Sequence, residues 1–284
     1  MSRPTLLSTL LAGILLVGVV ASSSTPVHAL GRQREMKERL VHEIDSALAA
    51  VKATPQQREQ VRAAVGEVLR TAGEAFGSTG QATEVDELLR IFGGEHLDDR
   101  ALSGLRNRRD AKHGKLGDAL MDAFDEIHGA LSREQRQQLT DYARGKAQGK
   151  HMKAFQEKMM SGLVNAQVED VLDQLGASEA ERQAARQTRD VVLGALQAAR
   201  ADKDARMDHL ASLFRDDTVD RASLQRFRSE SDQQVRALMD AVQQAVRRLH
   251  DGLSPAHRQQ LVQLVRDRRA RHRAVQAAES SEGF

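Results

Sequence analysis

The feature that most constrains the fold of this sequence is an internal repeat, because two similar halves are expected to adopt the same fold. When every residue is compared with the one 122 positions later, an ungapped match runs from Leu88 to Leu139, and at eight or more positions a large apolar residue faces another, as Leu88 faces Leu210 and Phe92 faces Phe214. Earlier in each copy the offset is 124, as in the pairing of Arg58 with Arg182. Self-similarity over so long a period indicates that one structural unit occurs twice.

The change of offset predicts a loop within each unit, since Gly and small polar residues tolerate changes of length. In the first unit this loop is expected over Gly73–Gly80. A second glycine-containing stretch, Gly145–Gly149, predicts the junction between the units. We therefore expect a first unit over residues 30–148 and a second over residues 149–284 with a basic C-terminal tail, both preceded by a separate segment, residues 1–29.

That opening segment has the layout of a cleaved secretory signal. A basic start leads into an apolar stretch over residues 6–21 and then to a small-residue site that ends at Ala29. The alternative, an N-terminal membrane anchor, needs about 20 apolar residues, and this stretch is shorter. We expect cleavage after Ala29, export to the periplasm and no stable membrane insertion.

Apolar spacing within each unit predicts helices and no strands. A seam advances by alternating fours and threes, which is the pattern of one long helix packing against another. In the second unit it comprises Phe227, Ser231, Gln234, Leu238, Val242, Ala245 and Leu249, and in the first unit Leu105, Arg109, Lys112, Leu116, Leu120, Ala123 and Ile127. Its polar positions predict loose packing, or a face toward solvent or a ligand. With no Cys, no Trp and only eight aromatic residues (seven Phe and one Tyr), the composition agrees with an all-α fold of about four helices per unit.

Four helices are expected to begin with one phrase, a hydroxyl residue followed three positions later by Gln, Glu or His and then by Arg. This phrase predicts a capping box. In a capping box the hydroxyl at the N-cap accepts from the backbone amide three residues on, and the side chain of that third residue bonds to the backbone amide of the N-cap. The motif residues are Thr54, Gln57, Leu131, Ser132, Gln135, Ser178, Glu181, Leu253 and Ser254. The two phrases lie 78 residues apart in the first unit and 76 in the second.

These motifs, the signal segment and the long charged middle helix resemble the periplasmic Spy/CpxP family, which is defined by paired Leu-Thr-x-x-Gln motifs. The nearest copy is Leu131-Ser132-x-x-Gln135, whereas the second unit has Glu181 and His257 in place of Gln. Each substitution keeps the hydroxyl at the N-cap. The resemblance covers residues 34–145 and again residues 155–273, so it implies the family fold in tandem duplication.

Members of that family are homodimers whose helical hairpins form a thin curved cradle with a basic and apolar concave face. The resemblance therefore implies two four-helix units related by a pseudo-two-fold axis, as a monomeric pseudo-dimer or a homodimer. It also implies an ATP-independent, holdase-type chaperone whose partners are unfolded or partly folded envelope proteins. The candidate client-binding residues are Arg106, Arg108, Arg109, Arg226, Arg228, Arg236, Arg247 and Arg248. A solvated helix face is the other interpretation of each single arginine.

A second function class stays open, a metal-responsive (zinc-binding) stress protein or a regulator of an envelope-stress sensor. Its candidate ligands are His128 and His250, which occupy equivalent positions. Both also suit the C-terminus of a helix, where a cationic side chain is favoured. Since no helical His-x-x-x-His pair is found, we expect no metal site and no cofactor, and keep these two histidines as the metal alternative.

The sequence lacks the motifs of common enzyme classes, including Gly-x-Ser-x-Gly, the P-loop and the dinucleotide fingerprint. We expect no enzymatic activity. The acidic pairs Asp98–Asp99 and Asp216–Asp217 predict N-terminal caps for the long helices. With 42 basic against 40 acidic residues, the chain has no strong net charge that would attract nucleic acid. We expect no nucleic-acid partner.

Overall fold

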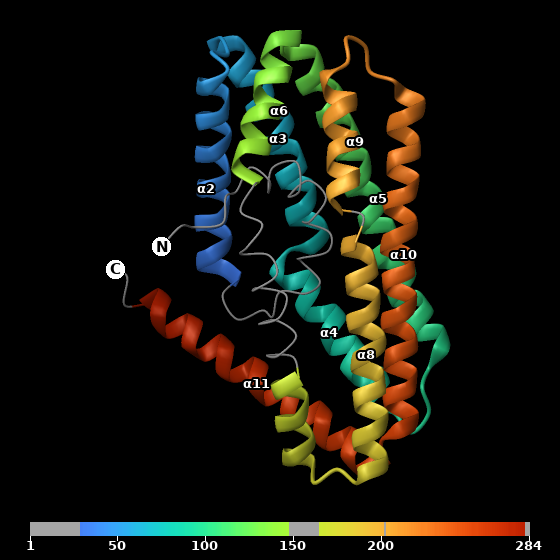
Figure 1. The fold of residues 1–284 in the computed structure, drawn as a ribbon. Helices are drawn as coiled ribbons and strands as arrows, with labels where there is room; N and C mark the ends of the chain where they lie inside the picture. Colours follow the sequence, from blue (N-terminus) through green and yellow to red (C-terminus); the bar gives the residue numbers. More distant parts are fainter. Residues whose placement is uncertain (1–28, 148–164, 202, 282–284) are drawn as a thin grey trace.

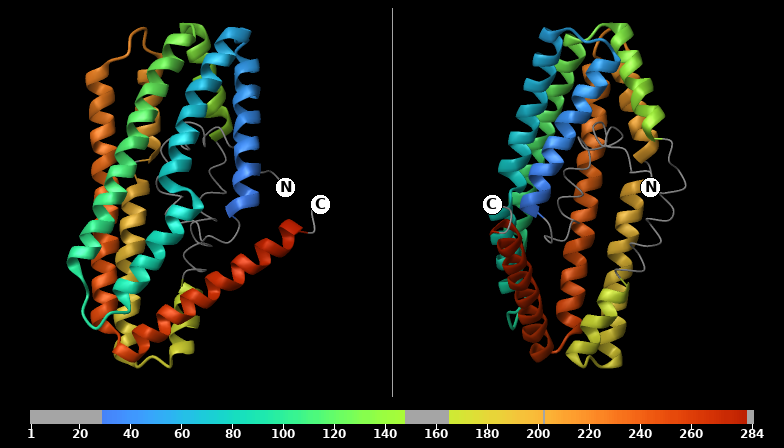
Figure 2. Two further views of the ribbon diagram at one scale, coloured as in Figure 1. Left: turned by 180° about the vertical axis from the view of Figure 1, so that it is seen from behind. Right: turned by 90° about the vertical axis from the view of Figure 1, so that its left-hand side faces the viewer.

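The computed structural model describes residues 29–147, 165–201 and 203–281, and these residues form helices and short connections without a strand. The all-α prediction is confirmed. The helices are α2 (Ala29–Ala50), α3 (Pro55–Phe76), α4 (Ser78–Phe92), α5 (Asp99–Ala130), α6 (Arg133–Ala147), α8 (Glu179–Ala201), α9 (Lys203–Arg215), α10 (Arg221–Gly252) and α11 (Pro255–Ser281). Residues 165–175 are helical as well. Most helices run along one long direction, and α11 crosses obliquely at one end (Figures 1 and 2).

Two helical hairpins form the main body. In the first half α3 packs along α5, and in the second half α8 packs along α10 (Figure 1). The halves also exchange contacts: α5 packs on α10, α6 on α9, and α11 on α4. Since α6 and α11 occupy equivalent places in the repeat, as do α4 and α9, the contacts between the halves are reciprocal.

The loop expected over Gly73–Gly80 is not present, and that prediction was wrong. Helix α3 continues through Phe76 and α4 starts at Ser78, so that only Gly77 interrupts them. The helix persists because Ala72 and Ala75 are buried in the hairpin. With this break, the first unit contains α2, α3, α4, α5 and α6 rather than about four helices.

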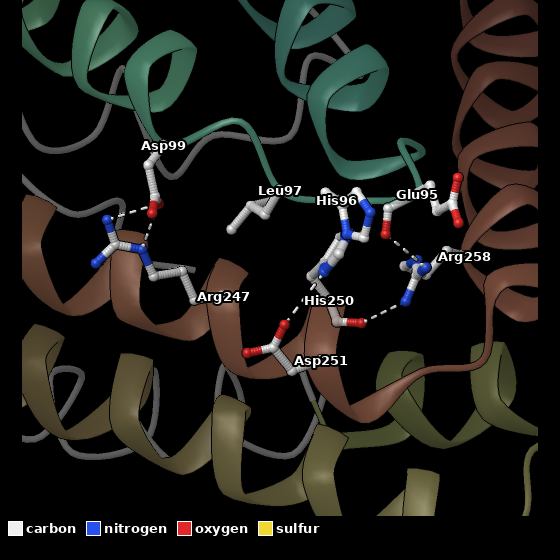
Figure 3. Close-up of a pocket in the computed structure, with 8 residues that line it drawn as sticks. All are labelled: Glu95, His96, Leu97, Asp99, Arg247, His250, Asp251 and Arg258. Carbon is white, nitrogen blue, oxygen red and sulfur yellow. Dashed lines mark hydrogen bonds and ion pairs between the residues drawn. The ribbon is translucent and has the colours of Figure 1, made fainter.

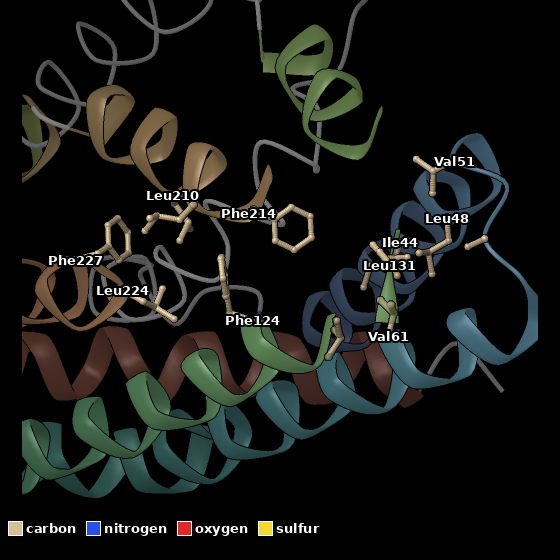
Figure 4. Close-up of a cluster of buried hydrophobic side chains, with 13 residues drawn as sticks. Ile44, Leu48, Val51, Val61, Phe124, Leu131, Leu210, Phe214, Leu224 and Phe227 are labelled. Carbon is tan, nitrogen blue, oxygen red and sulfur yellow. The ribbon is translucent and has the colours of Figure 1, made fainter. Parts of the chain in front are cut away.

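The largest apolar core draws on both halves. Ile44, Leu48 and Val61 of the first half lie in one cluster with Phe214 and Phe227 of the second half (Figure 4). Phe124 and Phe214 meet edge to face, with 5.5 Å between ring centroids. Aromatic pairs of this geometry add to the stabilisation gained by burial, so this cluster helps to hold the two halves together.

The two long helices start with aspartate caps. Asp98 accepts from the Ala101 amide at 2.9 Å, and Asp220 accepts from the Ala222 amide at 3.0 Å. The prediction from Asp98–Asp99 is thus confirmed, while that from Asp216–Asp217 was wrong. Helix α10 begins four residues later than Asp216–Asp217 would place it, because Asp220 has the extended backbone that an N-cap needs.

Some predictions fall on residues outside the described ranges. All but the last residue of the signal segment, residues 1–29, is among them. Of the junction expected over Gly145–Gly149, residues 145–147 form the end of α6 and residues 148–149 lie outside the described ranges, so the segment boundaries stay predictions. Within the described ranges, no helix combines the length and the apolar character needed to cross a membrane.

Candidate functional site

The two capping boxes of the first half face each other. Thr54 and Gln57 bond reciprocally, with the Thr54 amide donating to Gln57 Oε1 at 2.9 Å and the Gln57 amide donating to Thr54 Oγ1 at 3.2 Å. Ser132 and Gln135 do the same at 2.9 and 3.3 Å. Across the gap the two glutamines exchange side-chain amide bonds at 2.9 and 3.0 Å. The paired motif therefore fastens the start of α3 to the start of α6.

The second half replaces this amide pair with a charged one. Glu181 accepts from the Ser178 amide at 2.9 Å, from the Ser254 amide at 3.0 Å and from His257 Nδ1 at 2.8 Å. One carboxylate thus caps both α8 and α11. It bonds to the Ser254 amide, which is the amide that the residue at the position of His257 would bind in a capping box. The Ser254 amide is the largest influence that lowers the pKa of Glu181 to about 2, and burial opposes it.

The arginine that ends each phrase also has a structural role, which sequence reasoning missed. Arg58 and Arg182 donate to the carbonyls of Ala53 and Ala177, at 3.0 and 3.1 Å. Arg136 and Arg258, both buried, bind carbonyls at the C-terminal ends of α5 and α10. They also donate across to the other half, to the carbonyls of Asp216 at 2.9 Å and Glu95 at 3.3 Å. The recurrence of Arg four residues after each cap was the available signal.

His128 and His250 are buried at the ends of α5 and α10 and make equivalent contacts. His128 Nε2 donates to the Asp216 carbonyl at 2.9 Å, and His250 Nε2 donates to the Gly94 carbonyl at 3.2 Å. Each ring also meets a phenylalanine of the other half edge to face, Phe214 and Phe92 respectively. Among the described residues no group of three His, Cys, Asp or Glu is arranged to hold a metal ion. The two histidines thus join the halves.

A shallow pocket lies at one of these junctions (Figure 3). It is lined by Glu95, His96, Leu97, Asp99, Arg247, His250, Asp251 and Arg258. Arg247 bonds to Asp99 and Arg258 to backbone carbonyls, so the two cations of the pocket are engaged within the chain. The pocket mixes both signs of charge, with Glu95, Asp99 and Asp251 beside Arg247 and Arg258.

Five of the eight candidate client-binding arginines form ion pairs with carboxylates. Arg108 and Arg109 bind Glu87 and Glu84 of α4. The other three pair across the halves, as Arg106 with Asp240, Arg228 with Asp118 and Arg247 with Asp99. These five cations are largely neutralised where they lie, which favours a structural role for them.

Three of the candidates differ from those five. Arg236 and Arg248 are exposed on α10, and within the described residues neither has a carboxylate in ion-pair range. Arg226, also exposed, donates to the Ser223 hydroxyl at 2.7 Å rather than to a carboxylate. These three arginines, 226, 236 and 248, are the cations of the set that lie open to an external anion.

The polar half of the first seam is not loose. Glu84 of α4 pairs with Arg109 at 3.2 Å and with Lys112 at 2.5 Å, and its side chain is only 11% exposed. Burial would raise the pKa of Glu84, but bonds from Lys112 and Arg109 outweigh it and hold the pKa below its usual range. Beside them, the His113 ring packs against Phe76 in a tilted arrangement, with 4.9 Å between ring centroids.

An apolar stripe on the second hairpin was not recognised from the sequence. In the first half, equivalent positions form a fully buried cluster of Ala64, Val68, Ala72, Leu116, Leu120 and Ala123. Their counterparts in the repeat are Thr188, Val192, Leu196, Leu238, Val242 and Ala245, of which only Leu238 and Ala245 are buried. Val192, Leu196 and Val242 remain partly exposed, and we call these three side chains the apolar stripe. The hairpin α8–α10 therefore leaves partly exposed some of the apolar positions that α3–α5 buries.

Comparisons of this chain with protein-family models, with curated proteins and with solved structures find no match. The resemblance to the Spy/CpxP family thus stays a prediction that rests on the sequence features described above.

Proposed function

We propose that this protein is an ATP-independent periplasmic chaperone of the holdase type, which binds unfolded or partly folded envelope proteins. The observation that carries the proposal is the apolar stripe on α8–α10, because apolar groups left partly exposed can bind the apolar segments that an unfolded chain presents. The stripe offers no deep pocket, which favours weak binding of many chains over one specific ligand.

The open cations support the same proposal. Arg226, Arg236 and Arg248 lie on α10, the helix that also contributes Val242 to the stripe. Positive charge beside apolar surface attracts clients at long range, and apolar burial then holds them. In this proposal the other five arginines build the fold, and the apolar stripe with these three cations forms the client-binding face.

The test is the aggregation of two unrelated denatured proteins in the presence of residues 30–284. Val192→Ser with Leu196→Ser should reduce protection several-fold, while Val41→Ser should not, since Val41 is an exposed apolar residue on another helix. Circular dichroism of both variants serves as the control for folding. Equal protection by the stripe variant and the control would contradict the proposal.

Salt and chelator distinguish this function from the metal-responsive alternative. Raising the salt concentration should slow client capture by screening the open arginines, without abolishing it. EDTA should have no effect on protection. Protection that disappeared with EDTA and returned with zinc would favour the zinc-binding stress protein, with His128 and His250 as the first residues to substitute.

A further inference from the structure

The interface between the halves is built around an antiparallel pair of helices. Arg106 of α5 pairs with Asp240 of α10 at 2.5 Å, and Arg228 of α10 pairs with Asp118 of α5. Each residue of one pair lies 122 positions from its counterpart in the other. Because each half contributes one Arg and one Asp, this set of pairs would form equally well between two identical halves.

A second set of pairs occupies the outer ends of the same two helices, and its polarity is reversed. Asp99 pairs with Arg247 at 2.8 Å (Figure 3), and Asp125 pairs with Arg221 at 3.3 Å. Here again each residue lies 122 positions from its counterpart. The first half, however, supplies the acid at both places, and the second half supplies the arginine at both places.

The two sets share one register. In all four pairs the two residue numbers add up to 346, so the helices run antiparallel about a centre at Lys112 and Gln234. A pairing of two first halves in this register would place Asp99 against Asp125 twice. A pairing of two second halves would place Arg221 against Arg247 twice. Like charges in such positions oppose association and select against a wrong partner.

We propose that Asp99, Asp125, Arg221 and Arg247 determine which half can pair with which. The face of α5 and α10 fits an acidic half against a basic half, and it rejects a second copy of the same half. This proposal is independent of the chaperone function. It explains how two units that share one repeated sequence can form one defined pair.

The experiment compares charge variants of residues 30–284 by thermal unfolding. Arg221→Asp with Arg247→Asp makes both halves acidic at these places, and its unfolding midpoint should fall by about 5 °C at low salt. Adding Asp99→Arg and Asp125→Arg inverts both pairs and should restore most of that loss. The loss should shrink at about 0.5 M salt, where exposed charges are screened.

The matched control is Arg236→Asp with Arg248→Asp, which makes the same charge change at exposed, unpaired positions of the same helix. It should leave the midpoint within about 1 °C of the parent chain, since isolated surface charges contribute little. Two results would each overturn the proposal: a control that loses as much as the interface variant, or a fourfold inversion that restores nothing. In either case the four charges would act locally, each on its own helix, and not on the choice of partner.

Discussion

At the scale of the residue, equivalent turns in the two halves share one backbone conformation but place different residues in it. Lys52 has a φ of 53° and Gly176, its counterpart at the offset of 124, has a φ of 61°. In both, the next amide closes a helix-ending bond, Ala53 to Leu48 at 2.9 Å and Ala177 to Leu172 at 3.0 Å. A left-handed conformation is unfavourable for residues with a Cβ and is readily adopted by glycine.

We predict that Lys52→Gly stabilises the chain by up to about 1 kcal/mol, because it relieves this strain at an exposed position. Gly176→Lys should destabilise the chain by about 1 kcal/mol for the same reason. Urea denaturation of both variants measures the two changes. Effects of the same sign would show that side-chain contacts, and not the backbone, dominate at this turn.

Glu181 supplies the second residue-scale prediction. Its pKa is about 2 in the folded chain against 4.5 as a reference, so the stabilisation is complete above pH 4.5 and is lost as the pH falls toward 2. Glu181→Gln should cost about 2 kcal/mol at pH 7, since hydrogen bonds to a charged group are lost. Denaturation at pH 7, 4 and 3 should show the difference from the parent chain diminishing with acid. A difference that stays constant with pH would mean that Glu181 acts through packing.

At the scale of the element, the sequence predicted what local chemistry determines. The hydroxyl caps at Thr54, Ser132, Ser178 and Ser254 all accept from the amide three residues on, because the phrase itself contains both partners. The pairing of one box with the other could not be read from the phrase, since it depends on how α3 meets α6. For the same reason, the sequence did not predict that Val68 is buried and Val192 partly exposed, since both positions carry the same apolar residue in the repeat.

The junction of α4 and α5 carries an element-scale prediction. Burial, followed by the charge of Arg109, lowers the pKa of His113, and Asp110, Asp232 and Glu84 oppose this only in part. Because the pKa of His113 is lower in the folded chain, the unfolded chain binds a proton more readily. The free energy of unfolding is therefore highest above the reference pKa of 6.5 and decreases as the pH drops below that value. The junction should therefore weaken in mild acid.

Replacing the ring removes that dependence. His113→Leu should flatten the stability profile between pH 7 and pH 5 relative to the parent chain, whatever its effect at pH 7. The same substitution at the exposed His42 is the control for adding an apolar side chain. Urea denaturation at half-unit steps of pH gives the profile. A parent profile that is already flat in this range would refute the assignment of the acid sensitivity to His113.

At the scale of the whole molecule, the halves are tied together by contacts that repeat in both directions. His128 and His250, Arg136 and Arg258 each reach a carbonyl of the opposite half. The repeat in the sequence predicted that two units exist, and it contained no information on which surfaces meet. The superposition of the halves as two four-helix units about a two-fold axis stays a prediction, which these reciprocal contacts favour.

A shared core should make the chain unfold as one body. Phe214 of the second half is 5% exposed and packs against Phe124 and His128 of the first. Phe214→Ala should cost about 3–5 kcal/mol, the usual range for a buried phenylalanine. The only tyrosine, Tyr142, lies on α6 in the first half, so its fluorescence reports on the half that is not mutated. The tyrosine signal and the far-ultraviolet circular dichroism should shift together by the same amount in denaturant. A tyrosine transition that stayed at its parent midpoint, while the dichroism split into two steps, would mean that the halves unfold separately and that the core in Figure 4 does not couple them.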